Sequence, residues 1–226
     1  MKTLYVYGDS LLKATIPDAD FRYHFHWQEL LEGREQSLPT IVNRAKMGAT
    51  VRKGEVLVQH DLRRGMDMPA ALIGYGGNDS DFDWTAISQN PEDTHFPHTP
   101  LTQFVQTLEN IICSLVAHDV QPVLMTLPPI DAQRYLDFIC RNGRSREKIT
   151  YWLGDIQRIY HYQEMYSASI TQCAWKHRVP LIDVRSAFLP ERDLPEMIAS
   201  DGIHLTMKGY EKMFSLLCEG MECLSV

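Results

Sequence analysis

Three short segments, far apart in the chain, carry residues that could together cleave an ester. The first, Gly8-Asp9-Ser10-Leu11, follows an apolar run, and the second is Gly76-Gly77-Asn78-Asp79. The third, Asp201-Gly202-Ile203-His204, lies near the C-terminus. They offer a hydroxyl, a side-chain amide, and an imidazole with a carboxylate three residues before it. Acyl transfer by a serine nucleophile requires these groups.

Ser10 is the candidate nucleophile and His204 its candidate base. A serine hydroxyl becomes a good nucleophile when a base within hydrogen-bond reach accepts its proton. Asp201 is near enough in sequence to aim its carboxylate at one ring nitrogen of His204, which leaves the other for Ser10. Each residue alone has a simpler interpretation, as a turn residue or a surface histidine. The three together favour a catalytic triad.

Two further residues could stabilise the negative charge that develops on the substrate oxygen. That charge needs fixed donors around it. Asn78 could supply a side-chain N–H, and Gly48 could supply a backbone N–H because a glycine lets the backbone approach the substrate closely. An ordinary turn would also explain either residue, and Gly48 carries the less specific signal.

Short β-rich runs alternate with longer helical patterns, which predicts an α/β fold with a parallel sheet. The predicted strands are 3–7, 40–43, 70–74, 122–126 and 180–183. The predicted helices are 100–118, with Thr99 as its cap, 154–176, and 207–219, with Thr206 as its cap. We expect one domain over residues 1–226, since no change in composition marks a boundary.

Two long connections follow the predicted strands 70–74 and 122–126. Ligands bind at the carboxyl ends of strands in open parallel sheets, so both connections are expected beside the site. Phe82 and Trp84 are candidate substrate-binding residues, because aromatic rings beside carboxylates suit a sugar or another polar alcohol. A structural cap or a dimer contact would explain the first connection equally well. The basic stretch 134–148 suits an anionic acceptor or a solvated loop.

The blocks resemble, in their order, the SGNH or GDSL hydrolase superfamily. The serine, glycine, asparagine and histidine of that family's name correspond here to Ser10, Gly48, Asn78 and His204. The second block usually reads Asn-x-Gly-x-x-Gly. Here Asn43 keeps its register, but Ala45 replaces the first glycine.

The resemblance implies a flavodoxin-like three-layer α/β/α sandwich around a mostly parallel five-stranded sheet. It also implies an acyl-enzyme on Ser10, an oxyanion held by Asn78 and the backbone N–H groups of Gly48 and Ser10, and no metal or organic cofactor. The expected substrate is a carboxylic ester with a short acyl group, such as acetyl, on a soluble polar or carbohydrate-like alcohol. Lysophospholipids and thioesters are alternatives within the superfamily.

Two other classes of function stay open. The Gly-Asp and Gly-Asn segments loosely resemble a metal-dependent phosphoesterase, but histidine ligands are missing at the matching positions. His24 with His26, and His95 with His98, are spaced closely enough to share a metal, although such pairs are more often loop or core histidines. We therefore predict no metal site. A non-catalytic binding module on the same fold is the other alternative.

Composition limits the partners and the compartment. The 226 residues carry a net charge of −7, and the pI is near 5.7, which argues against nucleic-acid binding. No stretch approaches the ~18 apolar residues of a membrane span, and the N-terminus lacks a signal-peptide pattern. The five cysteines form no C-x-x-C pair and are expected as reduced, mostly buried thiols, which favours the cytoplasm. The expected partner is a small ester, and the sequence allows a homo-oligomer.

Overall fold

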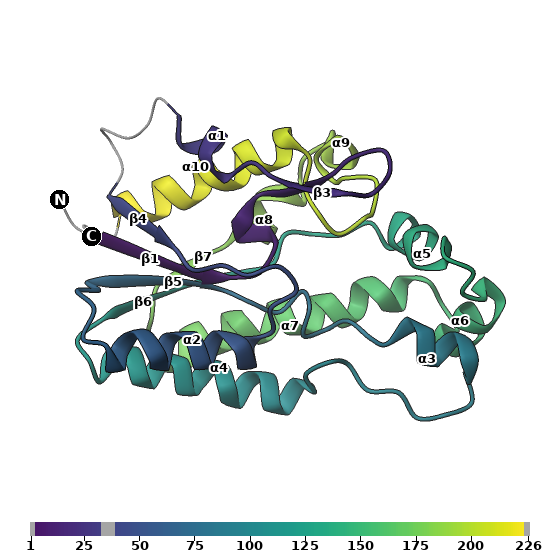
Figure 1. Cartoon of the computed structure of the whole chain (residues 1–226), viewed down its shortest axis with the longest axis horizontal. Coiled ribbons are helices and arrows are strands. Elements are labelled where there is room, and N and C mark those ends of the chain that lie inside the picture. The colour runs from purple at the N-terminus through teal and green to yellow at the C-terminus, as the bar shows by residue number, and fades with distance from the viewer. Residues whose placement is uncertain (1–2, 33–38, 224–226) are drawn as a thin grey trace.

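A five-stranded sheet lies at the centre of the chain, with helices on both faces (Figure 1). The computed structural model describes residues 3–32 and 39–223. The strands are β1 (Thr3–Gly8), β4 (Thr40–Asn43), β5 (Ala70–Gly74), β6 (Gln121–Met125) and β7 (Leu181–Ile182). Every neighbouring pair is parallel. The predicted α/β class and parallel sheet are confirmed.

The strand order explains where a ligand can bind. In space the strands run β4-β1-β5-β6-β7, which is the order 2-1-3-4-5 of flavodoxin-like folds. The order reverses between β1 and β5, whose ends are level because Gly8 pairs with Gly74. Connections leave these two strands toward opposite faces, so a crevice forms at their carboxyl ends.

Helices cover the sheet on both sides (Figure 1). One face carries α2 (Val51–Arg63), α4 (Leu101–Val116) and α7 (Gln157–His177). The other carries α1 (Trp27–Leu31), α8 (Val184–Phe188), α9 (Leu194–Met197) and α10 (Met207–Cys223). Three helices lie together at one end, beyond the carboxyl ends of the strands: α3 (Trp84–Gln89), α5 (Ala132–Cys140) and α6 (Arg146–Leu153).

A short segment between β1 and β4 forms a hairpin outside the main sheet. The 3-10 helix η1 (Leu11–Lys13) leads into β2 (Thr15–Pro17), which pairs antiparallel with β3 (Tyr23–Phe25). The hydroxyl of buried Tyr210, on α10, donates to the carbonyl of Thr15 over 2.9 Å. This bond fixes the start of the hairpin to the helical layer.

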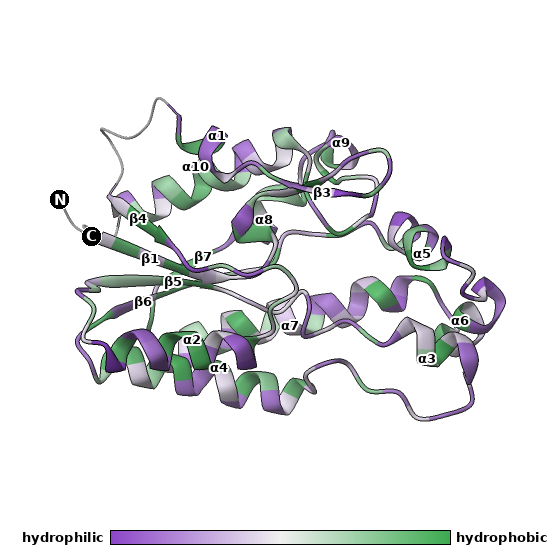
Figure 2. Ribbon diagram, in the orientation of Figure 1, coloured by the Kyte–Doolittle hydropathy of each residue, from purple (hydrophilic) through white to green (hydrophobic). Residues whose placement is uncertain are grey.

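Alternate residues of the central strands face two separate cores. Tyr7 and Ile73 pack against α2, α4 and α7, whereas Val6 and Leu72 pack on the side of α8 and α10. Because both faces are buried, β1 and β5 read as nearly continuous apolar runs. Figure 2 shows hydrophilic residues on the outer sides of α2 and α4, away from the sheet.

Several sequence predictions need correction. Thr99 does not cap the fourth helix: Pro100 holds that position, and Thr99 is buried and accepts a hydrogen bond from Tyr166. Gly154, with φ of +70°, ends α6, so α7 begins only at Gln157. The connections 75–99 and 127–150 contain α3, α5 and part of α6. Thr206 does cap α10, since its hydroxyl accepts from the N–H of Gly209 over 3.4 Å.

Cysteine burial also differs from the prediction. Cys173 is buried, Cys113 is exposed, and Cys140 and Cys218 are partly buried. Within residues 3–32 and 39–223, no helix is long and apolar enough to cross a membrane.

The packing of α2 against the end of β5 depends on Gly54. A Cβ atom there would lie 2.3 Å from Cε2 of the buried Tyr75 ring. We predict that Gly54→Ala lowers the free energy of unfolding by about 1–3 kcal/mol, because overpacking outweighs the ~1 kcal/mol that alanine gains in a helix. Urea denaturation measures the change. The exposed neighbour Lys53→Ala is the control, and a Gly54→Ala midpoint equal to the control's would contradict this packing.

Candidate active site

The three chemistry-bearing segments meet at the carboxyl ends of β1 and β5. His204 Nε2 lies 2.8 Å from Ser10 Oγ, and His204 Nδ1 lies 2.6 Å from Asp201 Oδ2. All three side chains are buried, with Ser10 7% exposed. The structure therefore brings together the three side chains that the sequence pattern indicated as candidate nucleophile, base and carboxylate.

A tight turn after β1 presents Ser10. A Cβ atom on Gly8 would lie 2.5 Å from Cδ1 of Leu12 and 2.8 Å from the carbonyl oxygen of Gly74, so only glycine fits there. Asp9 then accepts the N–H of Leu11 over 2.9 Å. This bond closes the turn in the manner of an Asx turn, and Ser10 stands at the start of η1.

The loop before α10 shapes the histidine and its carboxylate. Asp201 is fully buried and accepts the N–H groups of Ile203 and His204 as well as the ring nitrogen. Burial alone would raise the pKa of Asp201, but its bond to His204 and these N–H groups hold the pKa below the ordinary value. Gly202 has φ of +80°, and a Cβ atom there would lie 2.4 Å from the backbone nitrogen of Tyr135. Glycine is required at this position.

Asn78 bridges two segments of the site. Its Nδ2 donates to Asp9 Oδ2 over 3.0 Å and to the carbonyl of Ala49 over 3.3 Å. Both of its amide hydrogens are therefore directed at protein acceptors. Asn78 lines the same cavity as Ser10, so donation to an oxyanion would require it to share one of these bonds.

Gly48 lies on an exposed turn after β4. The turn is closed by the N–H of Ala49, which donates to Lys46 over 3.1 Å, and Gly48 has φ of +67°. A positive φ at the third residue of a turn favours glycine. The loop is attached to β1 because the N–H of Lys46 donates to Gly8. Gly48 is not among the described residues that line the cavity around Ser10.

Asp9 connects the turn that carries Ser10 to Asn78, a contact that the sequence did not predict. It is 2% exposed, precedes Ser10 in the chain and accepts a hydrogen bond from Asn78. Burial raises its pKa to about 6, against the lowering effects of the Leu11 N–H, the charge of His204 and the Asn78 amide. Its place inside the Gly8-Asp9-Ser10 segment was the available signal.

A cavity of about 70 Å³ opens beside Ser10 and His204. The connections 75–99 and 127–150 both contribute to its wall, as predicted. Phe82 and Trp84 line it, but they are only 4% and 7% exposed. Trp84 Nε1 donates to Asp81 Oδ1 over 2.8 Å, and the Tyr135 hydroxyl donates to Asp81 Oδ2 over 2.7 Å. The polar atoms of this wall are thus paired with one another.

The basic stretch 134–148 is occupied by internal contacts. Arg134 donates to the carbonyls of Pro195 and Ile198, and Arg146 pairs with Asp137 over 2.5 Å. The remaining cations also have partners: Arg144 at Thr85 and Ile139, Lys148 at Gln89, and Arg141 over the rings of Phe21 and Phe138. These contacts hold α5 and α6 in place and offer no open anion site.

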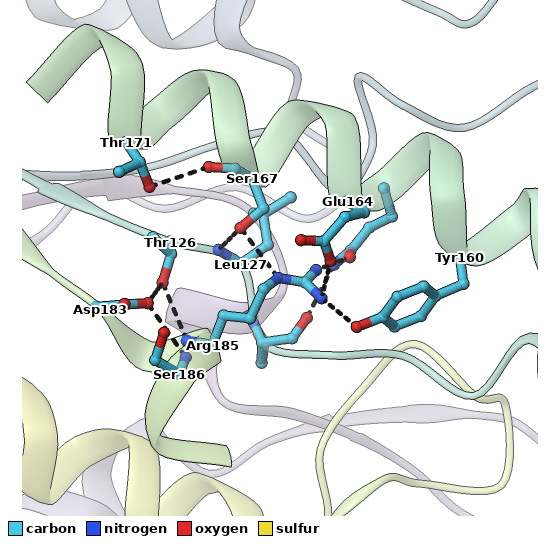
Figure 3. A network of polar contacts seen from close by, with 11 residues as sticks. Thr126, Leu127, Tyr160, Glu164, Ser167, Thr171, Asp183, Arg185 and Ser186 are labelled. Carbon is cyan, nitrogen blue, oxygen red and sulfur yellow. Dashed lines mark hydrogen bonds and ion pairs between the residues drawn. The ribbon is translucent and has the colours of Figure 1, made fainter. Parts of the chain in front are cut away.

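Behind the cavity lies a buried arginine network, shown in Figure 3. Arg185, on α8, is 5% exposed and reaches toward α7. Its guanidinium contacts four side chains of that helix: Tyr160, Gln163, Glu164 and Ser167. Gln163 lines the cavity and donates to the carbonyl of Pro128, which also lines it. Arg185 therefore supports one wall of the cavity through Gln163. Its position three residues after the end of β7 is the feature of the sequence that could have indicated a place near the site.

The histidine pairs make contacts with neighbouring side chains and backbone carbonyls. Among the described residues, no three His, Cys, Asp or Glu side chains gather closely enough to hold a metal ion. His24 and His26 instead contact Asp18 and Glu29, and His98 contacts the carbonyl of Asn78.

Known proteins resemble this chain in sequence and in structure. The family model described as GDSL-like Lipase/Acylhydrolase matches residues 6–212. The chain belongs to the GDSL-like lipase/acylhydrolase family. It is an ester hydrolase by this membership, and the sequence resemblance to the SGNH/GDSL superfamily is confirmed.

Individual relatives of this GDSL-family chain are distant. An isoamyl acetate-hydrolyzing esterase 1 homolog from Bos taurus is 26% identical over 183 residues, covering 78% of this chain and 66% of that protein. The Homo sapiens counterpart is 23% identical over 220 residues, covering 95% of this chain and 79% of that protein.

Solved structures show that the fold is shared. A lipase/acylhydrolase from Enterococcus faecalis has a TM-score of 0.68 at 18% identity, with 98% of this chain and 96% of that one covered. An acetylxylan esterase from Geobacillus stearothermophilus has a TM-score of 0.65 at 15% identity, with 97% and 94% covered.

Asp79, next to Asn78, should make stability depend on pH. It is fully buried and accepts the N–H of Val51 at the start of α2, and burial raises its pKa to about 6. The unfolded carboxyl ionises near its ordinary value of 3.8, so the folded state holds more protons between about pH 4 and 6. The free energy of unfolding therefore falls as pH rises through this window. In Asp79→Asn, the free energy of unfolding should decrease by about 2–3 kcal/mol less than in the wild type over the same pH window.

Urea denaturation at pH 4.5, 5.5 and 7.0 measures the effect. The exposed Asp67→Asn, which leaves the Val51 contact intact, is the matched control and should follow the wild type. Parallel curves for wild type and Asp79→Asn would show that Asp79 does not titrate in this window.

Proposed function

We propose that the chain is a serine esterase that uses Ser10, His204 and Asp201 as a catalytic triad. The observation that carries the proposal is the continuous hydrogen-bonded series from Ser10 Oγ through both ring nitrogens of His204 to Asp201. An accessible cavity adjoins the hydroxyl, as attack on a substrate carbonyl requires.

The proposed reaction has two steps. Ser10 Oγ attacks the ester carbonyl while His204 Nε2 takes its proton, and Asp201 stabilises the imidazolium that forms. The tetrahedral intermediate collapses, the alcohol leaves with the proton from His204, and an acyl-enzyme remains on Ser10. Water, deprotonated by His204, then attacks the acyl carbon and restores the serine.

The oxyanion would be held by three donors: Asn78 Nδ2 and the backbone N–H groups of Ser10 and Gly48. Removing one such donor typically costs about 2.7–4 kcal/mol of barrier. Asn78 and Ser10 both line the cavity, and the Asn78 amide would share with the oxyanion one of the hydrogens that it now donates to Asp9 and Ala49. Gly48 needs the loop 46–49 to approach the substrate from its exposed position.

For the substrate we propose a short acyl group, acetyl above all, on a small alcohol. The cavity is small, and the names of both the isoamyl acetate-hydrolyzing relatives and the acetylxylan esterase neighbour contain an acetyl ester. A polar or carbohydrate-like alcohol is the first candidate, because the sequence of residues 75–99 is rich in acids and aromatics and one structural neighbour is named an acetylxylan esterase. An alkyl alcohol is the second candidate, because Phe82 and Trp84 are too buried to offer open faces for stacking on a sugar.

Hydrolysis of p-nitrophenyl esters from acetate to decanoate tests the proposal. Activity should be highest on acetate, and Ser10→Ala should lower kcat by at least about 10³-fold, because no other group in the series can form the acyl-enzyme. Chelator should change nothing.

The same assay includes a control variant and results that would contradict the proposal. Ser186→Ala, at an exposed serine outside the cavity, should keep wild-type rates. Activity that survives Ser10→Ala or disappears with chelator would refute the serine mechanism in favour of a metal enzyme. A preference for decanoate would point to a lysophospholipase or thioesterase. Comparing isoamyl acetate with an acetylated xylose then separates the two alcohol classes.

A further inference from the structure

The β2–β3 hairpin brings an aromatic side chain onto the histidine of the site. Tyr23, the first residue of β3, packs its ring against the His204 imidazole, with centroids 5.1 Å apart and planes tilted by 55°. Its hydroxyl is near enough to Asp201 for the charge of that carboxylate to help raise the pKa of Tyr23. Tyr23 is not among the described residues that line the cavity around Ser10.

The hairpin that carries Tyr23 is held at its start and at its tip. At its start, Tyr210 binds the carbonyl of Thr15. At its tip, the Phe21 ring lies 5.2 Å from that of Phe138 on α5, and the Arg141 guanidinium stacks over Phe21 at 4.2 Å. Phe21 has φ of +59°, a conformation that packing must hold in place. A ring held in this way can restrain the imidazole without ever touching substrate.

We propose that Tyr23 is a positioning residue for the His204–Asp201 pair. Its ring keeps water from one face of the imidazole, and its hydroxyl donates to Asp201. This inference rests on the proposed serine mechanism, because it assigns Tyr23 a role through His204.

The chemistry follows from the charge on Asp201. That carboxylate stabilises the imidazolium formed when His204 takes the proton of Ser10. A hydrogen bond from the Tyr23 hydroxyl would offset part of the negative charge on Asp201. The carboxylate then stabilises the His204 imidazolium less strongly. Burial, and then the charge of Asp201, raise the pKa of Tyr23 to about 12, so the hydroxyl keeps its proton at neutral pH. Two other titratable groups interact with this pair: Asp9 with His204, and Tyr210 with Asp201. Arg141 and Tyr135 interact with Tyr23 itself.

Tyr23→Phe separates the hydroxyl from the ring. With the donor lost, Asp201 favours the imidazolium more strongly, so the base stays protonated to higher pH. The acidic limb of the kcat/KM profile should move up by about half to one pH unit, which corresponds to one hydrogen bond. KM should change less than twofold. Tyr23→Leu also removes the ring, and kcat should fall about tenfold as the imidazole loses its orientation.

A control on the same strand tests whether only hairpin stability matters. His24→Ala removes the contact with Asp18, 3.1 Å away at the exposed side of the hairpin, and should leave kcat and the pH profile unchanged. Melting temperatures confirm that each variant is folded. Wild-type kcat and pH profile in folded Tyr23→Phe and Tyr23→Leu would overturn the proposal, and so would equal losses in His24→Ala.

A readout independent of activity separates this proposal from the proposed function. NMR of histidine-labelled protein follows exchange of the Nδ1 proton of His204 with water, and the signal is assigned by its absence in His204→Asn. Exchange should be several-fold faster in Tyr23→Leu than in wild type. Equal rates would overturn the role of Tyr23 even in an active esterase. Faster exchange in a chain without esterase activity would support the positioning while the proposed function fails.

Discussion

The hydrogen bond between Ser10 Oγ and His204 Nε2 joins two residues 194 positions apart. Its 2.8 Å length depends on β1, which ends in the turn that carries Ser10, and on the loop anchored before α10. Neither segment could hold its side chain alone, because a short loop has too few contacts to fix a rotamer. The parallel sheet supplies the rigid frame, and its switch point between β1 and β5 places the crevice beside that bond.

Buried polar groups around the bond are connected rather than isolated. Asp9 holds the turn and Asn78 at once, and Asp201 accepts three donors from its own loop. Arg185 supports the cavity wall through Gln163. A buried polar group without partners costs about 1–3 kcal/mol, so each of these links also stabilises the fold that presents the site. Structure and site are therefore built from the same contacts.

The sequence predicted the parts of the site that depend on local order. Ser10 and His204 belong to short motifs beside predicted strands and helices. The strand pattern correctly indicated that such motifs gather at one edge of the sheet. Tyr23 and Arg185 were missed, since their roles arise from packing between elements distant in the chain. Thr99 was assigned wrongly as a cap because its burial under Tyr166 is a tertiary effect. Gly48 has the turn conformation that favours glycine, but its catalytic role stays a prediction.

Covalent labelling tests the central claim most directly. A p-nitrophenyl alkylphosphonate should react with the Ser10 hydroxyl as an ester does, release one equivalent of p-nitrophenol per chain, and stay attached. Peptide mapping by mass spectrometry should place the adduct on the peptide containing Ser10, and His204→Asn should slow the reaction by at least about 10²-fold because the general base is lost. An unlabelled chain, or an adduct on another residue, would contradict the account.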